Sequence, residues 1–195
     1  ITSNSEFQYF PNETISFWVS ERVKKIFKKE SKLSIFYDTK VGLQTGDNDI
    51  FRRNWQEVSV KKSSLKKGRK WFPYNSGGDY RKWYGNHYYF VNWEDNGASI
   101  KSVKPKSVIR NEKFYMKESL SWSKVTSSGF SLRYFPEGFL FDVAGCSVFE
   151  KNVSLFPVLG LLNSCLNIPL LKSLSQTINY EVGQVSNVPI NKGVF

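Results

Sequence analysis

Short segments rich in aromatic and β-branched residues recur between residues 34 and 150, and each is bounded by Gly, Asn, Asp or Pro. Such segments are typical of strands separated by turns. The expected strands lie at residues 34–46, 51–60, 87–93, 98–103, 117–125, 129–135 and 146–150. This pattern predicts that a β-sheet, rather than a helical bundle, forms the centre of the fold.

Helical periodicity is confined to the two ends of the chain. Residues 12–30 place apolar side chains on one helical face, with Asn12 as the expected N-cap. These side chains are Ile15, Trp18, Val19, Val23, Ile26 and Phe27. Residues 156–167 are expected to form a helix closed by Pro169, with further helix up to residue 176. An extended exit segment is expected at residues 180–190.

These expectations combine into one α+β domain over residues 1–195, with a twisted, mixed or antiparallel sheet at about 34–150 and flanking helices. A hydrophobic content of 40% and an aromatic content of 16% are typical of a folded globular domain. The chain begins with Ile and a polar segment, without Met or an apolar leader. We therefore expect a piece of a longer protein.

The longest apolar run, residues 156–171, is interrupted by two prolines, two asparagines and a serine, so it is too polar to cross a bilayer. We expect a soluble, cytoplasmic bacterial protein with no membrane partner. Cys146 and Cys165 lie in apolar contexts without CxxC spacing. This favours two buried, reduced thiols over a disulfide or a metal pair.

The net charge of +11 is concentrated in the first part of the chain. Residues 1–120 hold 23 Lys and Arg against 13 Asp and Glu, whereas residues 121–195 hold 5 against 4. Basic runs at residues 24–29 and 61–70 would place a positive potential over one face, and phosphate is the commonest partner of such a face. A solvated lysine-rich surface without a partner is the alternative.

Few residue patterns support catalysis. His87 is the single histidine and lies in a strand-like pattern, where a core or edge histidine is favoured over a catalytic one. Residues 42–46 contain two glycines but no Gly-Lys-Ser/Thr, so they predict a turn entering a strand. Glu30 and Lys32 have the spacing of a nuclease pair but lie at a helix end. The stretch FDVAGCSVF (residues 141–149) is only a weak match to an S-adenosylmethionine loop.

The stretch GGDYRKWYGNHYYFVNW (residues 77–93) predicts an exposed loop followed by a buried strand. Arginine can form two parallel hydrogen bonds with a guanine edge or a phosphate, and adjacent glycines allow close approach of a ligand. Strand alternation predicts that either Tyr89 and Val91 or Tyr88 and Phe90 face the core. Burial of Trp83 and Tyr84 in the core is the alternative.

Four long blocks, in order and over most of the chain, carry a family resemblance: residues 41–58, 71–97, 111–145 and 159–164. They resemble the C-terminal half of BREX-type (PglX) adenine-specific DNA methyltransferases and of type IIG restriction-modification enzymes with TaqI-like specificity domains. In such enzymes an N-terminal domain binds S-adenosylmethionine and carries the Asn-Pro-Pro-Tyr motif. The resemblance implies that this chain is the DNA target recognition domain, with no cofactor of its own.

The resemblance also implies site residues. Thr45, Asn48 and Asp49 match a Thr-Gly-x-Asn-Asp block, and residues 81–86 match an Arg-Lys-Trp-Tyr-Gly-Asn block. Residues 121–123 match a block usually written Thr-Trp-Ser, with Ser121 in place of Thr. The candidate DNA-binding residues are Thr45, Asn48, Lys66, Lys67, Arg69, Lys70, Gly77, Gly78, Arg81, Lys82, Trp83, Tyr84, Ser123 and Lys124.

Blocks shared by enzymes that recognise different sites are expected to shape the fold or hold phosphate. The side chains that recognise bases are therefore expected elsewhere, at residues 61–70 or 100–110. The implied partners are double-stranded DNA and the catalytic domain of the parent protein. An enzyme in its own right and a module that docks other phage-defence subunits remain alternatives, and cleavage by the parent stays open.

Overall fold

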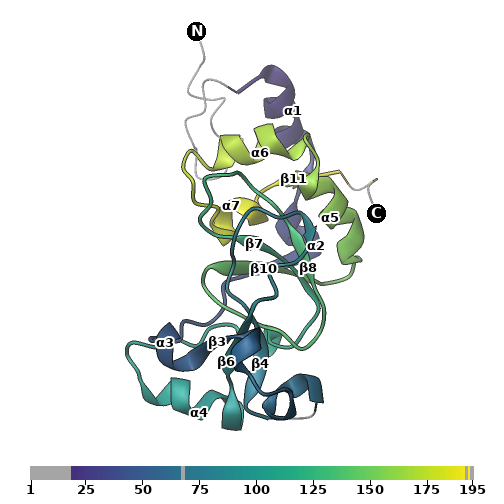
Figure 1. Cartoon of the computed structure of the whole chain (residues 1–195). Coiled ribbons are helices and arrows are strands. Elements are labelled where there is room, and N and C mark those ends of the chain that lie inside the picture. The colour runs from purple at the N-terminus through teal and green to yellow at the C-terminus, as the bar shows by residue number, and fades with distance from the viewer. Residues whose placement is uncertain (1–18, 67–68, 192, 194–195) are drawn as a thin grey trace.

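The computed structural model describes residues 19–66, 69–191 and 193, and it has an elongated shape with the first helix and the helices of the C-terminal part gathered at one end (Figure 1). Helices combine with mixed and antiparallel sheets, so the expected α+β class is confirmed. The expected single sheet is divided into a five-stranded sheet, a four-stranded sheet and a two-stranded ribbon. Two hydrophobic clusters form the core, one on each side of the middle of the molecule.

The five-stranded sheet lies in the middle and carries helices on one face. In spatial order its strands are β2 (Tyr37–Lys40), β10 (Gly145–Glu150), β7 (Ser119–Ser123), β8 (Arg133–Phe135) and β5 (Trp83–Tyr84). The pairs are antiparallel except β5 with β8. The helices packed near it are α2 (Leu33–Phe36), α5 (Leu155–Asn163), α6 (Asn167–Leu174) and α7 (Val182–Ser186). Leu120, Trp122 and Val148 belong to the cluster shared with these helices.

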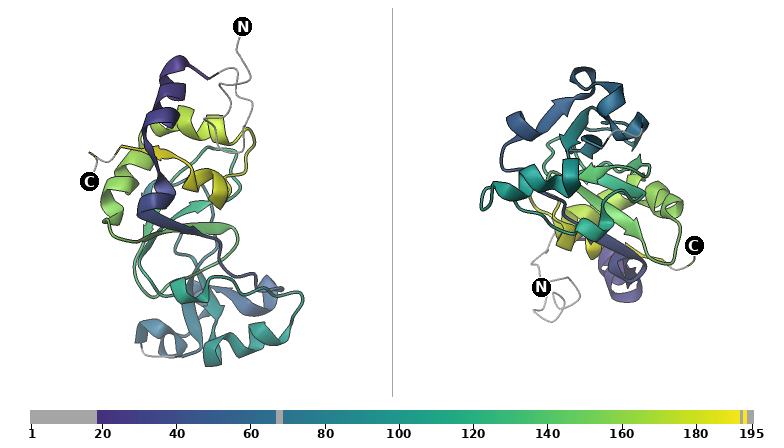
Figure 2. Two further views of the ribbon diagram at one scale, coloured as in Figure 1. Left: turned by 180° about the vertical axis from the view of Figure 1, so that it is seen from behind. Right: turned by 90° about the horizontal axis from the view of Figure 1, so that it is seen from below.

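The four-stranded sheet lies at the end opposite α5, α6 and α7 (Figures 1 and 2). Its strands in spatial order are β3 (Arg52–Asn54), β6 (Tyr89–Asn92), β4 (Trp71–Asn75) and β9 (Leu140–Phe141), and β4 with β9 is a parallel pair. Around it lie α3 (Asn48–Phe51), α4 (Glu94–Ser102) and the short 3₁₀ helices η3 (Trp55–Glu57), η4 (Val60–Lys62), η5 (Ser64–Lys66) and η6 (Glu112–Phe114). Tyr74, Val91 and Leu140 are fully buried in its cluster.

The first helix, α1 (Glu21–Lys29), is followed by the ribbon of β1 (Ser31–Lys32) and β11 (Pro189–Ile190). Ser20 has an extended backbone and its hydroxyl caps the first turn of α1, so the expected continuous helix from residue 12 is wrong at this residue. Val23 is buried, while Ile26 is 37% exposed. The expected cap Asn12, with Ile15 and Trp18, lies outside the described residues.

The junction of the two sheets depends on Asn75, the last residue of β4. Its amide nitrogen donates to Ser121 Oγ at 2.6 Å and to Gly145 O at 3.2 Å, and its amide oxygen accepts from Gly77 N at 3.2 Å. A Cβ on Gly145 would lie 2.5 Å from Asn75 Oδ1, so only glycine fits there. One buried side chain thus joins β4 to β7 and β10 and begins the loop that follows.

Several expected strands are confirmed, and the errors have identifiable causes. Strands occur within six of the seven expected segments, but residues 98–103 lie in α4 and its C-terminal end. Strand β4 was not expected because it contains Pro73; β9 pairs only with Tyr74 and Asn75, so no strand needs the missing N–H on that edge. Residues 42–46 lead into the helical turn α3 rather than directly into a strand.

The C-terminal part is more helical than expected. Pro169 lies in the first turn of α6, where its missing N–H costs nothing, and α5 already ends at Asn163. The expected extended exit contains helix α7 before β11. Cys146 is buried and free as expected, whereas Cys165 is exposed, because it lies in the turn between α5 and α6.

Within the described residues, no single helix is long and apolar enough to span a membrane. The pair α5 and α6 meets the length and composition criteria together, but the two helices are bent by 83° relative to each other.

Replacing Asn75 with Ala is expected to lower the free energy of unfolding by about 2–5 kcal/mol, because partners on three segments each lose one buried hydrogen bond. Urea denaturation measures this change. Asn152→Ala, at an exposed bend, is the control and should stay within about 0.5 kcal/mol of the parent. Equal effects of the two substitutions would contradict the role given to Asn75.

Candidate nucleic-acid interface

Residues 77–86 form a loop between β4 and β6, and polar groups of the five-stranded sheet hold its backbone. Ser123 Oγ donates to Gly78 O at 2.6 Å, and Arg133 Nη1 donates to Asp79 O at 3.4 Å. The loop also closes on itself, because Asn86 Nδ2 donates to Asp79 O at 2.9 Å. These contacts fix the loop, so the directions of its exposed side chains are fixed too.

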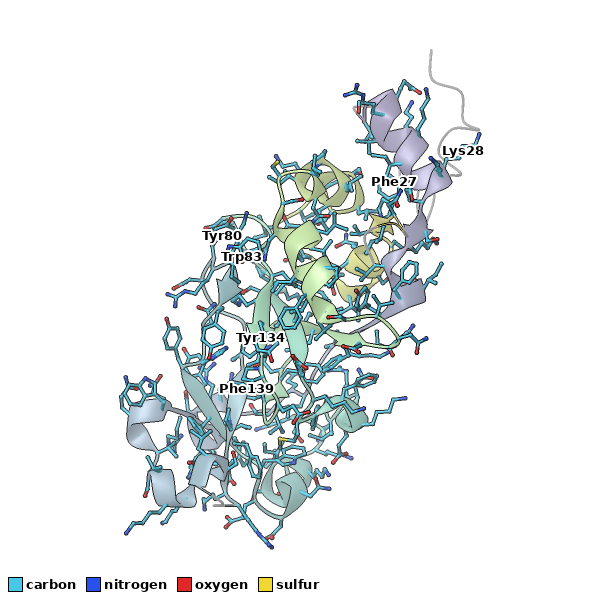
Figure 3. All side chains as sticks on the ribbon, turned by 90° about the vertical axis from the view of Figure 1, so that its right-hand side faces the viewer. Phe27, Lys28, Tyr80, Trp83, Tyr134 and Phe139 are labelled. Atoms are coloured by element: carbon cyan, nitrogen blue, oxygen red, sulfur yellow. The ribbon has the colours of Figure 1, made fainter. Side chains whose placement is uncertain are left out.

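Trp83 and Tyr84 are presented to solvent by a strained turn. Trp83 has a φ of 75°, and Tyr84 N donates to Lys82 O at 3.0 Å, which together define a γ-turn with a positive central φ. The two rings are 53% and 60% exposed, so the expected exposure is confirmed and the core alternative is wrong. Figure 3 shows Trp83 and Tyr80 near one edge of the molecule, with Tyr134 further in.

Arg81 lies beside these rings. Its guanidinium carbon is 6.0 Å from the centroid of the Tyr88 ring, and that ring is 42% exposed. A Cβ on Gly85 would overlap Arg81 Cδ, and the φ of Gly85 is 124°, so this path of the arginine requires glycine. Across the described parts of the chain no carboxylate forms a salt bridge with Arg81. Its charge is available to a ligand.

Lys82 has a different role from its neighbour. Its ammonium group donates to Asn163 O at 2.7 Å, at the last residue of α5. A cation is favoured at a helix C-terminus because the free carbonyl groups carry partial negative charge. Lys82 therefore ties the loop to the helical end of the molecule.

Two exposed aromatic residues far apart in the sequence extend the loop's surface. Trp55 N donates to Tyr88 O at 2.9 Å, and the Trp55 ring is 55% exposed. We call Trp55, Arg81, Trp83, Tyr84 and Tyr88 the aromatic-basic surface. Sequence reasoning included neither Trp55 nor Tyr88 in the site, because it assigned both to strand segments. The signal it passed over was a tryptophan directly after an Arg-Arg-Asn run.

Strand β3 adds two arginines close to this surface. Arg52 Nη1 donates to Ser76 Oγ at 3.1 Å, and its guanidinium carbon lies 4.3 Å from the centroid of the Tyr89 ring. The Arg53 guanidinium carbon lies 5.8 Å from the centroid of the Trp71 ring. Arg53 Nη1 donates to the backbone oxygens of Asp49 and Arg52, so each guanidinium uses one nitrogen within the chain. The remaining N–H groups of a guanidinium stacked on a ring can donate to phosphate or a base.

The structure separates the other predicted site residues. Thr45 is buried and donates to Asn48 Oδ1 at 2.8 Å, which shapes the turn before α3. Arg69 is exposed at the opposite end of β4 from the loop, and there Lys70 Nζ lies 3.1 Å from Glu94 Oε2. The side chain of Lys66 and all of Lys67 lie outside what the structure describes. Lys124 Nζ lies 3.0 Å from Glu181 Oε1, beside α7.

Gly77, Gly78 and Ser123 do lie with Arg81 to Tyr84, but in supporting positions. Gly77 is buried, and Ser123 is 7% exposed beneath the loop. The same serine accepts from Arg133 Nη2 at 3.1 Å. Burial, and secondly the charge of Arg81, lowers the pKa of the Arg133 guanidinium to about 10, so it stays charged at neutral pH.

His87 lies beneath Tyr84 in a box of rings. The ring centroids of Tyr84, Phe135 and Phe139 lie 4.5, 4.7 and 4.9 Å from that of His87. Burial lowers the pKa of His87 below its usual value of 6.5, and the charge of Arg133 lowers it further. A hydrogen bond with the Tyr134 backbone raises the pKa and partly offsets these effects. A neutral imidazole in an aromatic box supports Tyr84, in agreement with the prediction of a core or edge histidine.

The stretch at residues 141–149 is an internal turn. Asp142 Oδ2 accepts from Ser76 Oγ at 2.7 Å, and its Oδ1 accepts from Ala144 N and Gly145 N. Burial raises the pKa of Asp142, partly offset by these hydrogen bonds. The carboxylate is used by the chain itself. Among the residues that the structure describes, no group of three or more His, Cys, Asp or Glu could hold a metal ion.

The fold and the surface define an α+β domain that presents exposed rings and arginines from a fixed loop. Over 98% of its length the chain is similar to two curated proteins: adenine-specific methyltransferase PglX of Lacticaseibacillus casei (strain Zhang) and adenine-specific methyltransferase BrxX of Escherichia coli O9:H4 (strain HS). Each is 36% identical to it. The chain spans only 17% and 16% of these relatives. No family model matches the chain.

The expected resemblance to adenine-specific methyltransferases is thereby confirmed for one part of such proteins. The names of the two relatives describe whole proteins. The role of the part that this chain matches is a separate question, which the geometry of the aromatic-basic surface addresses.

The stability of the folded chain is expected to fall as the pH drops below about 6.5, because folding holds His87 neutral and the unfolded chain binds the proton more tightly. Urea midpoints at about pH 7.5 and about pH 5.5 measure this change. In His87→Gln the decrease should be smaller, whatever the absolute stability of that variant. Equal decreases in both proteins would show that other groups cause the pH dependence.

Proposed function

We propose that this chain is the DNA target recognition domain of a BREX-type adenine-specific DNA methyltransferase. In this proposal it binds double-stranded DNA and positions a separate catalytic domain, which uses S-adenosylmethionine, at the target adenine. The similarity over 98% of the chain to parts of PglX and BrxX supports the parent assignment. The DNA-binding role is supported by the charge and by the aromatic-basic surface.

Arg81 carries the proposal further than any other single residue. It is exposed, has no carboxylate partner among the described residues, and is held beside exposed rings by a loop that cannot easily move. A fixed guanidinium can bind a phosphate with two hydrogen bonds and loses little side-chain entropy on binding. A carboxylate-rich surface would not suit DNA, and here the net charge of +11 has the required sign.

Phosphate contacts and base recognition are expected to use different parts of the molecule. The loop at residues 77–86 belongs to a block shared with the resembling enzymes and would hold the backbone of DNA. Residues 61–66, 69–70 and 100–110 lie around the four-stranded sheet, at the end farthest from α1 (Figure 1). In that region Lys61, Lys62 and Arg110 are exposed, so base recognition is assigned to it in this proposal.

A protein-docking role has a specific observation in its favour beside α6. A cavity of about 400 Å³ lies between α6, the loop at residues 126–130 and Tyr180, and Tyr80 and Lys82 of the loop at residues 77–86 also line it. Around it the side chains of Val125, Leu166, Ile168 and Ile178 are 56%, 70%, 51% and 54% exposed. Exposed apolar groups of this kind suit a protein contact. We assign this region to docking of the catalytic domain or of another phage-defence subunit, and the two roles are compatible.

Replacing Arg81 with Gln is expected to weaken binding of all DNA duplexes about equally, by about 1–3 kcal/mol. It should also reduce the slope of log K against log salt by about one, because one phosphate contact releases about one counterion. Fluorescence anisotropy across a salt series measures both. The control Arg22→Gln removes the same charge from an exposed position on α1 and should change little. If the affinity of the unsubstituted chain for DNA does not depend on salt, the proposal is wrong.

The chain alone is expected neither to bind S-adenosylmethionine nor to methylate DNA. Asp142, the one carboxylate in the weak cofactor-like stretch, already binds Ser76 and two backbone amides, and no Pro-Pro sequence occurs in the chain. Equilibrium binding of labelled S-adenosylmethionine and transfer of its methyl group to DNA measure this. Methyl transfer by the chain alone would instead favour an enzyme in its own right.

A further inference from the structure

Trp83 adopts a backbone conformation that costs free energy. A positive φ is an outlier for a bulky side chain, and the γ-turn centred on Trp83 is a strained turn type. Glycine would form the same turn without this cost. The turn persists because both sides are held: Arg81 N donates to Ser131 Oγ at 3.3 Å, and Trp83 N donates to Leu132 O at 3.0 Å.

The folded chain does not recover this cost by burying the indole ring. The ring of Trp83 is 53% exposed, and within residues 19–66, 69–191 and 193 no aromatic ring or cation stacks on it. Tyr84, in contrast, packs against His87. A strained backbone that exposes a large flat ring is typical of a ligand contact, since strain of this kind persists mainly where it serves function.

The neighbouring charges indicate the chemistry of that ligand. Arg81 is exposed two residues before Trp83, and Arg52 and Arg53 lie on β3, which pairs with β6, the strand that follows the loop. A flat apolar ring next to cations suits a nucleic acid, whose bases stack on aromatic rings while its phosphates bind arginine. In an intact duplex each base face is already covered by its neighbours. A protein ring can therefore reach a base face only where the stack is opened.

We propose that Trp83 inserts into an opened base stack and fills the gap that an extruded base leaves. This inference rests on the proposed function, because methylation of an adenine in a duplex requires that base to leave the stack. The rigid loop would insert the ring while Arg81 holds the adjacent phosphate. Trp83 is then a positioning residue: it stabilises the opened duplex and takes no part in methyl transfer.

The test compares a fluorescein-labelled intact duplex with the same duplex carrying one abasic site, which provides a gap without knowledge of the recognised sequence. By anisotropy the parent chain should bind the abasic duplex about tenfold more tightly, as expected for one stacked base. Trp83→Ala should lose this preference, so that it binds the abasic duplex no more than about twofold more tightly than it binds the intact duplex. Trp83→Phe should keep part of the preference.

Trp55→Ala is the matched control, because Trp55 is 55% exposed on the same surface but has no positive φ. It should keep the preference for the abasic duplex. The fluorescence of 2-aminopurine placed beside the abasic site should fall on binding of the parent and not on binding of Trp83→Ala. The thermal midpoint of Trp83→Ala should be no lower than that of Trp55→Ala, since neither ring is buried.

The outcomes separate this inference from the proposed function. Equal binding of both duplexes by the parent, or a preference retained in Trp83→Ala, overturns the role of Trp83 and leaves DNA recognition intact. If Trp83→Ala weakens binding of both duplexes equally, the role of Trp83 is also overturned, and the result would indicate a groove or backbone contact. Absence of DNA binding by the parent chain at low salt overturns both, and would indicate a protein partner for this surface.

Discussion

The hydrogen bonds of the Asn75 side-chain amide hold the two sheets together and set the path of the loop that follows β4. The side chain donates to Ser121 of β7 and to the backbone of Gly145 in β10, and it accepts from the amide of Gly77. One group thus joins the two sheets and sets the start of the exposed loop. In a buried site such a network is strong when it is complete and costly when one partner is missing. The geometry of the surface is therefore coupled to the packing of the core.

The polar face of the five-stranded sheet follows from this arrangement. Strand β7 alternates apolar residues toward the helices with Ser119, Ser121 and Ser123 on the other face. The part-buried carbonyl groups of Gly78 and Asp79 in the loop accept from Ser123 and Arg133, respectively. With an apolar face the Gly78 carbonyl would lose its Ser123 donor, and the Asp79 carbonyl would keep only the donor from Asn86. The polar face requires a buried guanidinium, that of Arg133. In return it fixes the loop, whose backbone is strained at Trp83 and whose side chains are exposed.

The aromatic-basic surface shows how much of the site could be predicted. The exposure of Arg81, Trp83 and Tyr84 could be predicted, because glycines and charges on both sides of a short aromatic run indicate a loop. Ser123 was among the candidate site residues, but its supporting position beneath the loop was not predicted. Trp55 was missed, since its position beside Tyr88 is set by pairing of β3 with β6. Periodicity along one segment contains no information about which strand it will pair with.

The α+β class, most of the strands and the basic character could be predicted, because they follow from local pattern and composition. The resemblance to adenine-specific methyltransferases rests on the long sequence blocks that carry it. The burial of both Phe90 and Val91, against either alternation expected for β6, follows from the packing of the folded chain. Strand β6 is central in its sheet, with β3 and β4 on its two edges, and Val91 packs in the hydrophobic cluster of that sheet. Likewise, residues 98–103 became helical through packing of Ile100 in the second cluster. Long-range contacts outweigh local propensity, which differs by only about 1 kcal/mol between conformations.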